Sequence, residues 1–290
     1  MTLTFDKNIT LSDKTIKSYT DNLARLNKYN IDYKNFTDPH SLITDISNIN
    51  HISNATVNKY LSAILWYFKH NNLTHVSLPI LSQKITSINK DITKHYDTAK
   101  MTPNELTNFV EWTDVLKVYD KLYSERTHSE TAFRKCITIA PYVLLPPRRI
   151  EDYSLMYIVQ HIHDVTPDFN YYVINHKQFV FNKFKTHKKF KQQIIDLPND
   201  LHSLLHEFTL KYNLLGKKLL NNSDKDLSDK IKRIFFKYAG KGATINTLRH
   251  SYIIHCHNNN LLSTPHARKH TAWLMAHTHH TQQDVYLKVD

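Results

Sequence analysis

Glycine and cysteine are scarce in this chain, and long apolar runs are missing. The 290 residues include only 3 Gly and 2 Cys. Because Gly-rich phosphate-binding loops need several glycines close together, this chain has none, and we do not expect nucleotide-driven chemistry. Cys136 and Cys256 form no C-x-x-C pair, which argues against a disulfide framework or a cysteine-based zinc site and fits a reducing compartment. Since no apolar run approaches membrane-spanning length and the N-terminus lacks a signal-peptide pattern, we expect neither membrane insertion nor secretion.

Basic residues outnumber acidic residues by a wide margin. The chain has 38 Lys plus Arg against 26 Asp plus Glu, a net charge of +12, and 41% of its residues are hydrophobic. The hydrophobic content supports folded cores. A basic surplus of this size is typical of proteins that bind phosphates, in nucleic acid or at an anionic membrane surface, and nucleic acid is the favoured alternative.

Apolar spacing predicts a mainly α-helical chain with one small antiparallel β-sheet. In residues 11–26 and 52–70, apolar residues recur at helical spacing, with Ser12 as a candidate N-cap of the first helix and Ser53 or Asn54 of the second. Periodicity is lost from Asp91 to Pro103, which is typical of a linker and divides the chain into domains 1–98 and 99–290. In the second domain we expect strands at 171–174, 178–181 and 192–197, and helices at 104–123, 128–145, 148–158, 199–212, 226–239, 243–258, 264–277 and 279–287.

Three arginines stand in settings that require anionic partners. Arg249 lies on an apolar helix, where a buried guanidinium needs a carboxylate or a phosphate, and an internal salt bridge is the simpler alternative. Arg148 and Arg149 begin another helix, with an acid three residues after each. In the first register Glu151 would brace Arg148, and in the second Asp152 would brace Arg149. We favour Arg149, because an apolar residue follows it.

Five lysines and no acid lie between residues 183 and 191, between two predicted strands. Most lysines of this kind belong to solvated turns. A hairpin tip with a Lys-Thr pair, here Lys185 and Thr186, can instead reach into a DNA groove. The other candidate DNA contacts are Lys183, Lys188, Lys189, Lys191 and Arg148.

Four short motifs follow one another in a specific order. They are Arg-x-x-Asp, the Lys-Thr between strands, "NTLRH", and a His nine residues before a Tyr in "LMAHTHHTQQDVY". This order and spacing resemble the catalytic domain of the tyrosine recombinases, or phage-type integrases, whose patterns are R-x-x-E, a hairpin lysine, H-x-L-R-H and L-G-H-x8-Y. The front of the chain resembles that family's helical core-binding domain. The wording "PPRR-x-x-DY" is most similar to members carried by eukaryotic mobile elements, virophages and large DNA viruses.

The resemblance implies a recombinase that cleaves and rejoins double-stranded DNA through a 3′-phosphotyrosine, without metal or cofactor, as a homotetramer on paired sites. Tyr286 is the implied nucleophile, and Arg149 and Arg249 are the implied phosphate-binding pair. Lys185 is the implied general acid, and His277 the implied hydrogen-bond donor to the phosphate. Such an enzyme would act inside the cell where DNA is accessible, in a host nucleus, the cytoplasm or a viral factory.

The chain departs from the family pattern in three places. Asn246 replaces the first His of H-x-L-R-H, so a neutral donor stands where the family has a titratable group. The interval from Arg249 to His277 is a few residues longer than usual. Only four residues follow Tyr286, whereas family members often dock a longer tail on a neighbour, which leaves the mode of assembly open. Asp152 is expected to orient the site rather than react.

Other functions stay open at this point. A type IB topoisomerase or a telomere resolvase would share the same chemistry, and a DNA-binding relic would keep the fold without cleaving. A metal-binding protein is suggested by the 20 His, but these scatter without consistent ligand spacing. We therefore expect no metal site in the tail, and expect His279 and His280 to begin the helix that presents Tyr286.

Overall fold

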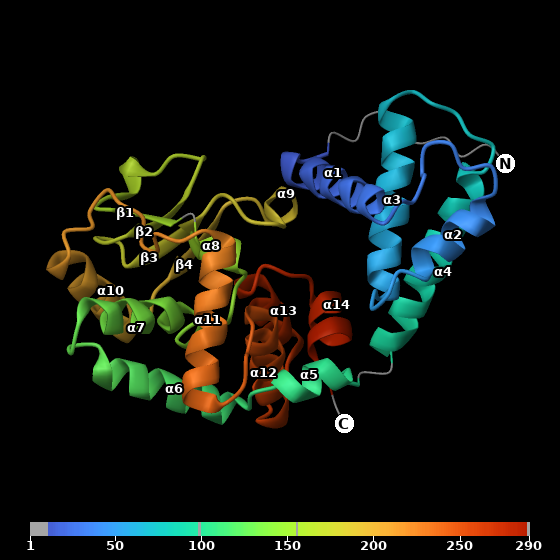
Figure 1. The fold of residues 1–290 in the computed structure, drawn as a ribbon. Helices are drawn as coiled ribbons and strands as arrows, with labels where there is room; N and C mark the ends of the chain where they lie inside the picture. The colour runs from blue at the N-terminus through green and yellow to red at the C-terminus, as the bar shows by residue number, and fades with distance from the viewer. Residues whose placement is uncertain (1–10, 98–99, 155, 289–290) are drawn as a thin grey trace. The chain divides into compact units, whose positions relative to one another are not determined.

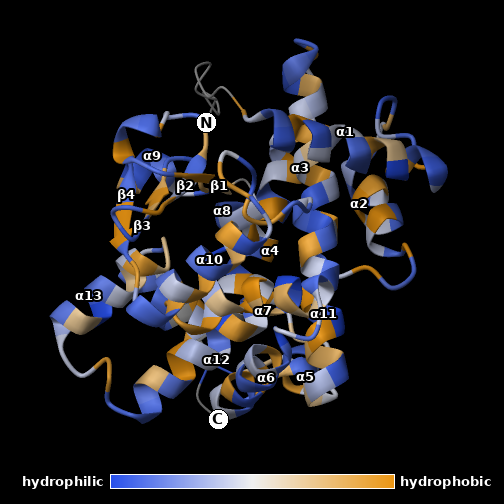
Figure 2. Cartoon of the chain, turned by 90° about the vertical axis from the view of Figure 1, so that its left-hand side faces the viewer, coloured by the Kyte–Doolittle hydropathy of each residue, from blue (hydrophilic) through white to orange (hydrophobic). Residues whose placement is uncertain are grey.

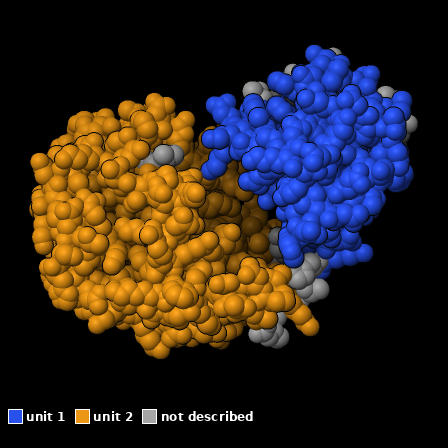
Figure 3. All heavy atoms as spheres, viewed as in Figure 1, with its two compact units in different colours: residues 1–98 blue, residues 99–290 orange. Residues whose placement is uncertain are grey.

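The computed structural model describes residues 11–97, 100–154 and 156–288, and the chain forms two compact units, residues 1–98 and 99–290 (Figures 1 and 3). Each unit has its own hydrophobic core. The fold is mainly helical with one small sheet, as the sequence predicts. Within the described ranges, no helix is both long and apolar enough to cross a membrane.

In residues 11–97, the described part of the first unit, the helices are α1 (Asp13–Lys28), α2 (Pro39–Ser47), α3 (Asn54–His70) and α4 (Leu78–Asp97). As predicted, the Ser12 and Ser53 side chains cap α1 and α3 by accepting hydrogen bonds from backbone N–H groups. Helix α3 is central and packs against the other three. The linker predicted from Asp91 is wrong at its start, because α4 continues through Asp97 and Ile92 extends its apolar face onto the core.

The second unit is built around α7 (Glu130–Val143), which packs against α6 (Trp112–Glu125), α10 (Asn199–Lys211) and α11 (Asp224–Ala239). Figure 2 shows that α7 is rich in hydrophobic residues. The single helix predicted at 104–123 is two helices, α5 (Pro103–Asn108) and α6, because Val110 turns into the core between them. The remaining helical segments are α8 (Ile150–Ser154), η1 (Ile162–Asp164), α9 (His187–Phe190), α12 (Ile245–Asn258), α13 (Pro265–Leu274), α14 (His279–Thr281) and the π-helical turn η2 (Gln282–Tyr286).

The sheet has four strands in the order β1 (Met156–Val159), β2 (Asn170–Val173), β3 (Gln178–Phe181) and β4 (Gln193–Asp196). Strands β2, β3 and β4 are antiparallel, as predicted, but β1 runs parallel to β2, so the sheet is mixed. The helix predicted over 148–158 is wrong in its second half. Residues 156 and 158 pack into the main core while 157 and 159 pack on the opposite face, and this alternation is that of a strand.

Candidate active site

The turn between α13 and α14 accepts hydrogen bonds from three arginines. Arg148 Nη1 donates to the carbonyl oxygen of Leu274 at 2.8 Å. Arg249 Nη1 donates to that of Met275 at 3.3 Å, and Arg149 Nη1 donates to that of Ala276 at 3.0 Å. Arg249 Nη1 also donates to the carbonyl of Pro147 at 3.0 Å, directly before the other two arginines. Backbone carbonyls therefore fix the positions of all three guanidiniums.

Ala276 has an unusual backbone conformation in this turn. Its φ is 52°, in the left-handed region that favours glycine. In this conformation its carbonyl accepts from Arg149 and also from the hydroxyl of Thr186 at 2.9 Å. Thr186 follows Lys185, and His277 follows Ala276. One carbonyl oxygen thus connects the Arg149 helix, the lysine-rich loop and the segment that carries His277.

Arg148 and Asp152 form a buried ion pair, which corrects the predicted pairing of Asp152 with Arg149. Arg148 Nε donates to Asp152 Oδ2 at 2.7 Å, and both side chains are 1% exposed. Burial raises the pKa of Asp152, and the positive charges of Arg148, Arg249 and Arg149 offset that effect only in part. The Arg148 guanidinium also lies 3.9 Å from the centre of the Phe181 ring. The Arg148 side chain is only 1% exposed, which argues against its predicted contact with DNA.

Arg149 instead faces a surface cavity of about 450 Å³. Lys185 and Asn246 line the same cavity, so it brings together three of the residues that the sequence singles out. Both are exposed, and Asn246 lies in the first turn of α12, after the Thr244 cap. Residues of α8, α11 and α12 complete the lining, which includes both signs of charge: Ile150, Glu151, Asp224, Ser228, Lys232, Thr244 and Ile245.

The lysine-rich loop is anchored at its start by Asn170, a buried residue that the sequence did not single out. Asn170 Nδ2 donates to the carbonyls of Asp152 and Lys183, at 2.8 Å each, and Oδ1 accepts from the backbone N–H groups of Asn182 and Lys183. The Asn170 amide thus connects the loop to α8 through four hydrogen bonds to backbone groups, and these contacts are visible only in the folded structure. Beyond the anchor, the side chains of Lys183, Lys188, Lys189 and Lys191 are exposed.

Arg249, His277 and Tyr286 form a second, buried cluster. Arg249 is fully buried, and its guanidinium lies 4.6 Å from the centre of the Tyr286 ring. The His277 ring stacks on Tyr286 at 5.1 Å, and His277 Nδ1 lies 2.7 Å from Arg249 Nη2. As predicted, His279 and His280 begin the helical segment that ends at Tyr286.

The contact with Arg249 fixes the tautomer of His277. A guanidinium only donates hydrogen bonds, so Nδ1 must accept and the ring proton must lie on Nε2. Nε2 is buried and has no hydrogen-bond partner among the described residues. Burial, and after it the charges of the three arginines, lowers the pKa of His277 to about 2. His277 therefore presents a neutral N–H donor that the protein leaves unpaired.

His250, the last residue of the "NTLRH" motif, also contacts Tyr286. Its Nδ1 lies 3.2 Å from the backbone carbonyl of Tyr286, and the two rings are 5.0 Å apart. On its other side, His250 Nε2 lies 3.8 Å from Glu105 Oε1 of α5. His250, which is on α12, thus connects the tail to α5.

Comparison with solved structures finds chains of similar fold. The fold is similar to the crystal structure of XerA recombinase, with a TM-score of 0.43 and 14% sequence identity, over 97% of this chain and 89% of that chain. No family model matches the sequence, and no curated protein matches it.

Proposed function

We propose that this chain is a site-specific DNA recombinase that cleaves and rejoins strands through a covalent 3′-phosphotyrosine. The observation that carries the proposal is the placement of Tyr286 against Arg249 and His277, next to a carbonyl that also holds Arg149. A tyrosine, two guanidiniums and an unpaired N–H donor are the groups that attack on a phosphodiester requires.

The proposed reaction begins with attack by the Tyr286 oxygen on phosphorus. The bond from phosphorus to the 5′-oxygen breaks, and the leaving oxygen takes a proton from Lys185, which lines the cavity with Arg149. The phenolic proton goes to water, since Asn246 cannot accept it and the His277 Nδ1 lone pair is occupied by Arg249.

In the transition state, negative charge develops on the non-bridging oxygens of the phosphate. Arg149 and Arg249 would bind these oxygens, since Arg249 Nε is a buried donor without a partner among the described residues. His277 Nε2 would supply a further hydrogen bond. Rejoining follows when a 5′-hydroxyl attacks the phosphotyrosine and the same groups act in reverse.

The substrate would be double-stranded DNA, with four copies of the chain assembled on two paired sites. Residues 1–98 would form the helical core-binding domain and residues 99–290 the catalytic domain. The exposed lysines at 183, 188, 189 and 191 would contact the DNA backbone, a role that their positive charge and accessibility support. The source implied by "PPRR-x-x-DY" is a mobile element or a large DNA virus or virophage.

Covalent trapping tests the proposal. Wild-type protein incubated with a nicked substrate should form an SDS-resistant protein–DNA adduct, and peptide mapping should place the DNA on Tyr286. Tyr286→Phe should bind the same DNA with unchanged affinity and form no adduct. Tyr238→Phe, a matched variant of a partly buried tyrosine outside the site, should retain the adduct. An adduct of undiminished yield in Tyr286→Phe would exclude this nucleophile.

A further inference from the structure

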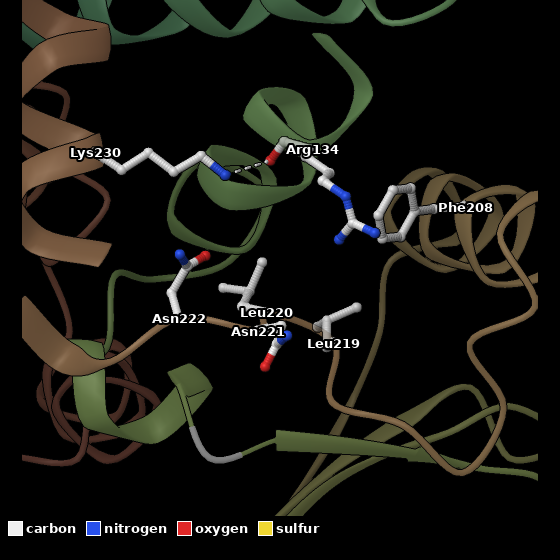
Figure 4. A pocket seen from close by; sticks show the side chains of 7 residues that line it. All are labelled: Arg134, Phe208, Leu219, Leu220, Asn221, Asn222 and Lys230. Atoms are coloured by element: carbon white, nitrogen blue, oxygen red, sulfur yellow. Dashed lines mark hydrogen bonds between the residues drawn. The ribbon is translucent and has the colours of Figure 1, made fainter. Parts of the chain in front are cut away.

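A second pocket, of about 300 Å³, lies between α7, α10 and the start of α11, and does not involve the proposed catalytic groups (Figure 4). It has two cationic side chains, Lys230 from α11 and Arg134 from α7. The rest of its lining combines apolar residues with two amides, and consists of Phe208, Leu219, Leu220, Asn221 and Asn222.

Lys230 is poorly satisfied by the protein. Its side chain is partly buried, and among the described residues its ammonium makes one long hydrogen bond, at 3.4 Å, to the backbone carbonyl of Arg134 (Figure 4). Burial comes first among the causes that lower the pKa of Lys230 to about 8, and the charges of Arg134, Lys135 and Arg233 follow. The fold thus places an amine where both desolvation and like charges oppose its ionisation.

Arg134 has hydrogen-bond donors that the described residues do not use. Its guanidinium packs over the Phe208 ring at 5.4 Å (Figure 4). Glu130 Oε1 lies 2.7 Å from both Nε and Nη2 of Arg134. Within the described part of the chain, no hydrogen bond engages Nη1. Glu130 neutralises one charge only, so the group of Arg134, Lys135, Lys230 and Arg233 stays strongly positive.

An arrangement of this kind does not help the protein fold. A partly buried cation next to other cations opposes folding unless a counter-charge is present, and an uncharged side chain of similar length would fill the same space without this penalty. Side chains that oppose stability without a structural return are typical of ligand sites. The ligand that would relieve this strain is an anion.

We propose that this pocket binds a phosphate group, with Lys230 and Arg134 as its cationic contacts. Phosphate oxygens accept from several donors at once, which suits a guanidinium, an ammonium and the amides of Asn221 and Asn222. The phosphate is either a small free anion or part of a DNA backbone. The first source is independent of the proposed recombinase function, and the second places a further DNA contact away from the cleavage site.

Calorimetric titration of the full chain with inorganic phosphate, in chloride buffer at constant ionic strength, tests the small anion. Wild-type protein should show one saturable site, and both Lys230→Met and Arg134→Gln should weaken it at least tenfold. Lys225→Met, an exposed lysine on the same helix, is the matched control and should leave it unchanged.

Fluorescence anisotropy with a short duplex over a range of salt concentrations tests the DNA backbone. If the pocket holds a DNA phosphate, Lys230→Met should reduce the slope of log K against log salt by about one, and Lys225→Met should not. This measurement does not require cleavage, so it is independent of the Tyr286 trapping result.

The stability of the ligand-free protein provides the remaining measurement. Lys230→Met should raise the melting temperature, because it removes a charge that opposes folding, and Lys230→Gln serves as a second variant if the methionine packs badly. The proposal is overturned if wild-type protein shows neither a saturable phosphate site nor a salt slope that depends on Lys230. It is also overturned if both Lys230 variants melt well below wild type, since the lysine would then be structural.

Discussion

Protonation of His277 should destabilise the fold strongly below neutral pH. In the folded chain its pKa is about 2, while an unperturbed histidine has a pKa of roughly 6.5. Below about pH 6.5 this histidine is protonated in the unfolded chain but not in the folded chain. Its contribution to the free energy of unfolding is therefore fully present above about pH 6.5 and decreases as the pH is lowered towards 2. At about 1.4 kcal/mol per pH unit, the loss between pH 7 and pH 5 is about 2 kcal/mol from this residue alone.

The measurement compares wild type with His277→Asn, whose amide oxygen can still accept from Arg249. Urea unfolding at pH 7 and pH 5, followed by tryptophan fluorescence in a Trp66→Phe background, reports on the second unit through Trp112 and Trp273. Subtracting the two pH dependences cancels the contributions of all other groups. These include His250 and His202, whose pKa values burial also lowers.

Between pH 7 and pH 5, His277→Asn should lose about 2 kcal/mol less free energy of unfolding than wild type, because the variant lacks the His277 contribution. His257→Asn, which removes an exposed histidine from α12, should behave as wild type. If wild type and His277→Asn lose the same stability within about 0.5 kcal/mol, a difference that surface substitutions alone can produce, His277 is not held neutral. The argument for an unpaired Nε2 donor would then be refuted.

Substitutions at Asp152, Ala276, Lys185 and Asn246 and one change of condition test the site. Asp152→Asn should cost about 3–5 kcal/mol of stability in urea unfolding, because it leaves the buried Arg148 charge uncompensated. Ala276→Gly should raise the free energy of unfolding by up to about 1 kcal/mol by relieving left-handed strain. Lys185→Ala should block cleavage of a normal substrate but not of one with a 5′-bridging sulfur, which leaves without a proton; rescue in Lys183→Ala instead would move the general acid. Asn246→His should retain or raise the single-turnover cleavage rate and Asn246→Leu should lower it, whereas a tenfold loss in the histidine variant would make the amide indispensable. Cleavage should persist in EDTA, and dependence on added magnesium or zinc would contradict a mechanism based on two arginines.

Two outcomes would contradict the stability predictions. A loss below about 1 kcal/mol in Asp152→Asn would mean that the carboxyl is protonated in the folded chain, as burial alone favours. A lower stability of Ala276→Gly would mean that the buried methyl group contributes more than the strain costs.

The sequence predicts regular structure best where the apolar spacing is unambiguous. Strand β3 lies where it was expected, at Gln178–Phe181, because residues 179 and 181 face the main core and 180 faces the opposite side of the sheet. Strand β1 was missed because a short apolar run fits a helix or a strand equally well. Its pairing with β2, which lies beyond η1, decides between them, and a local pattern does not contain that information.

The arginine pair shows the same limit at the candidate site. Asp152 follows Arg149 by three residues and Arg148 by four, and both spacings bring side chains together on a helix. Both guanidiniums also donate to carbonyls more than 120 residues later in the chain, Arg148 to Leu274 and Arg149 to Ala276, and these remote contacts decide which of them faces Asp152. The contacts of Asn170 and His250 are also non-local, since they join Asn170 to Asp152, 18 residues away, and His250 to Tyr286, 36 residues away.

The hydrogen bonds to the turn at residues 274–276 have a consequence for how this sequence can vary. The acceptors are main-chain oxygens, which every amino acid provides, so substitutions here leave the arginines in place provided that residue 276 can adopt a left-handed backbone. Glycine adopts that conformation most easily, yet alanine occupies it here. The shape of the site is therefore encoded in backbone conformation more than in side-chain identity. A search for related chains would do better to ask for this turn and its three donors than for a fixed string of letters.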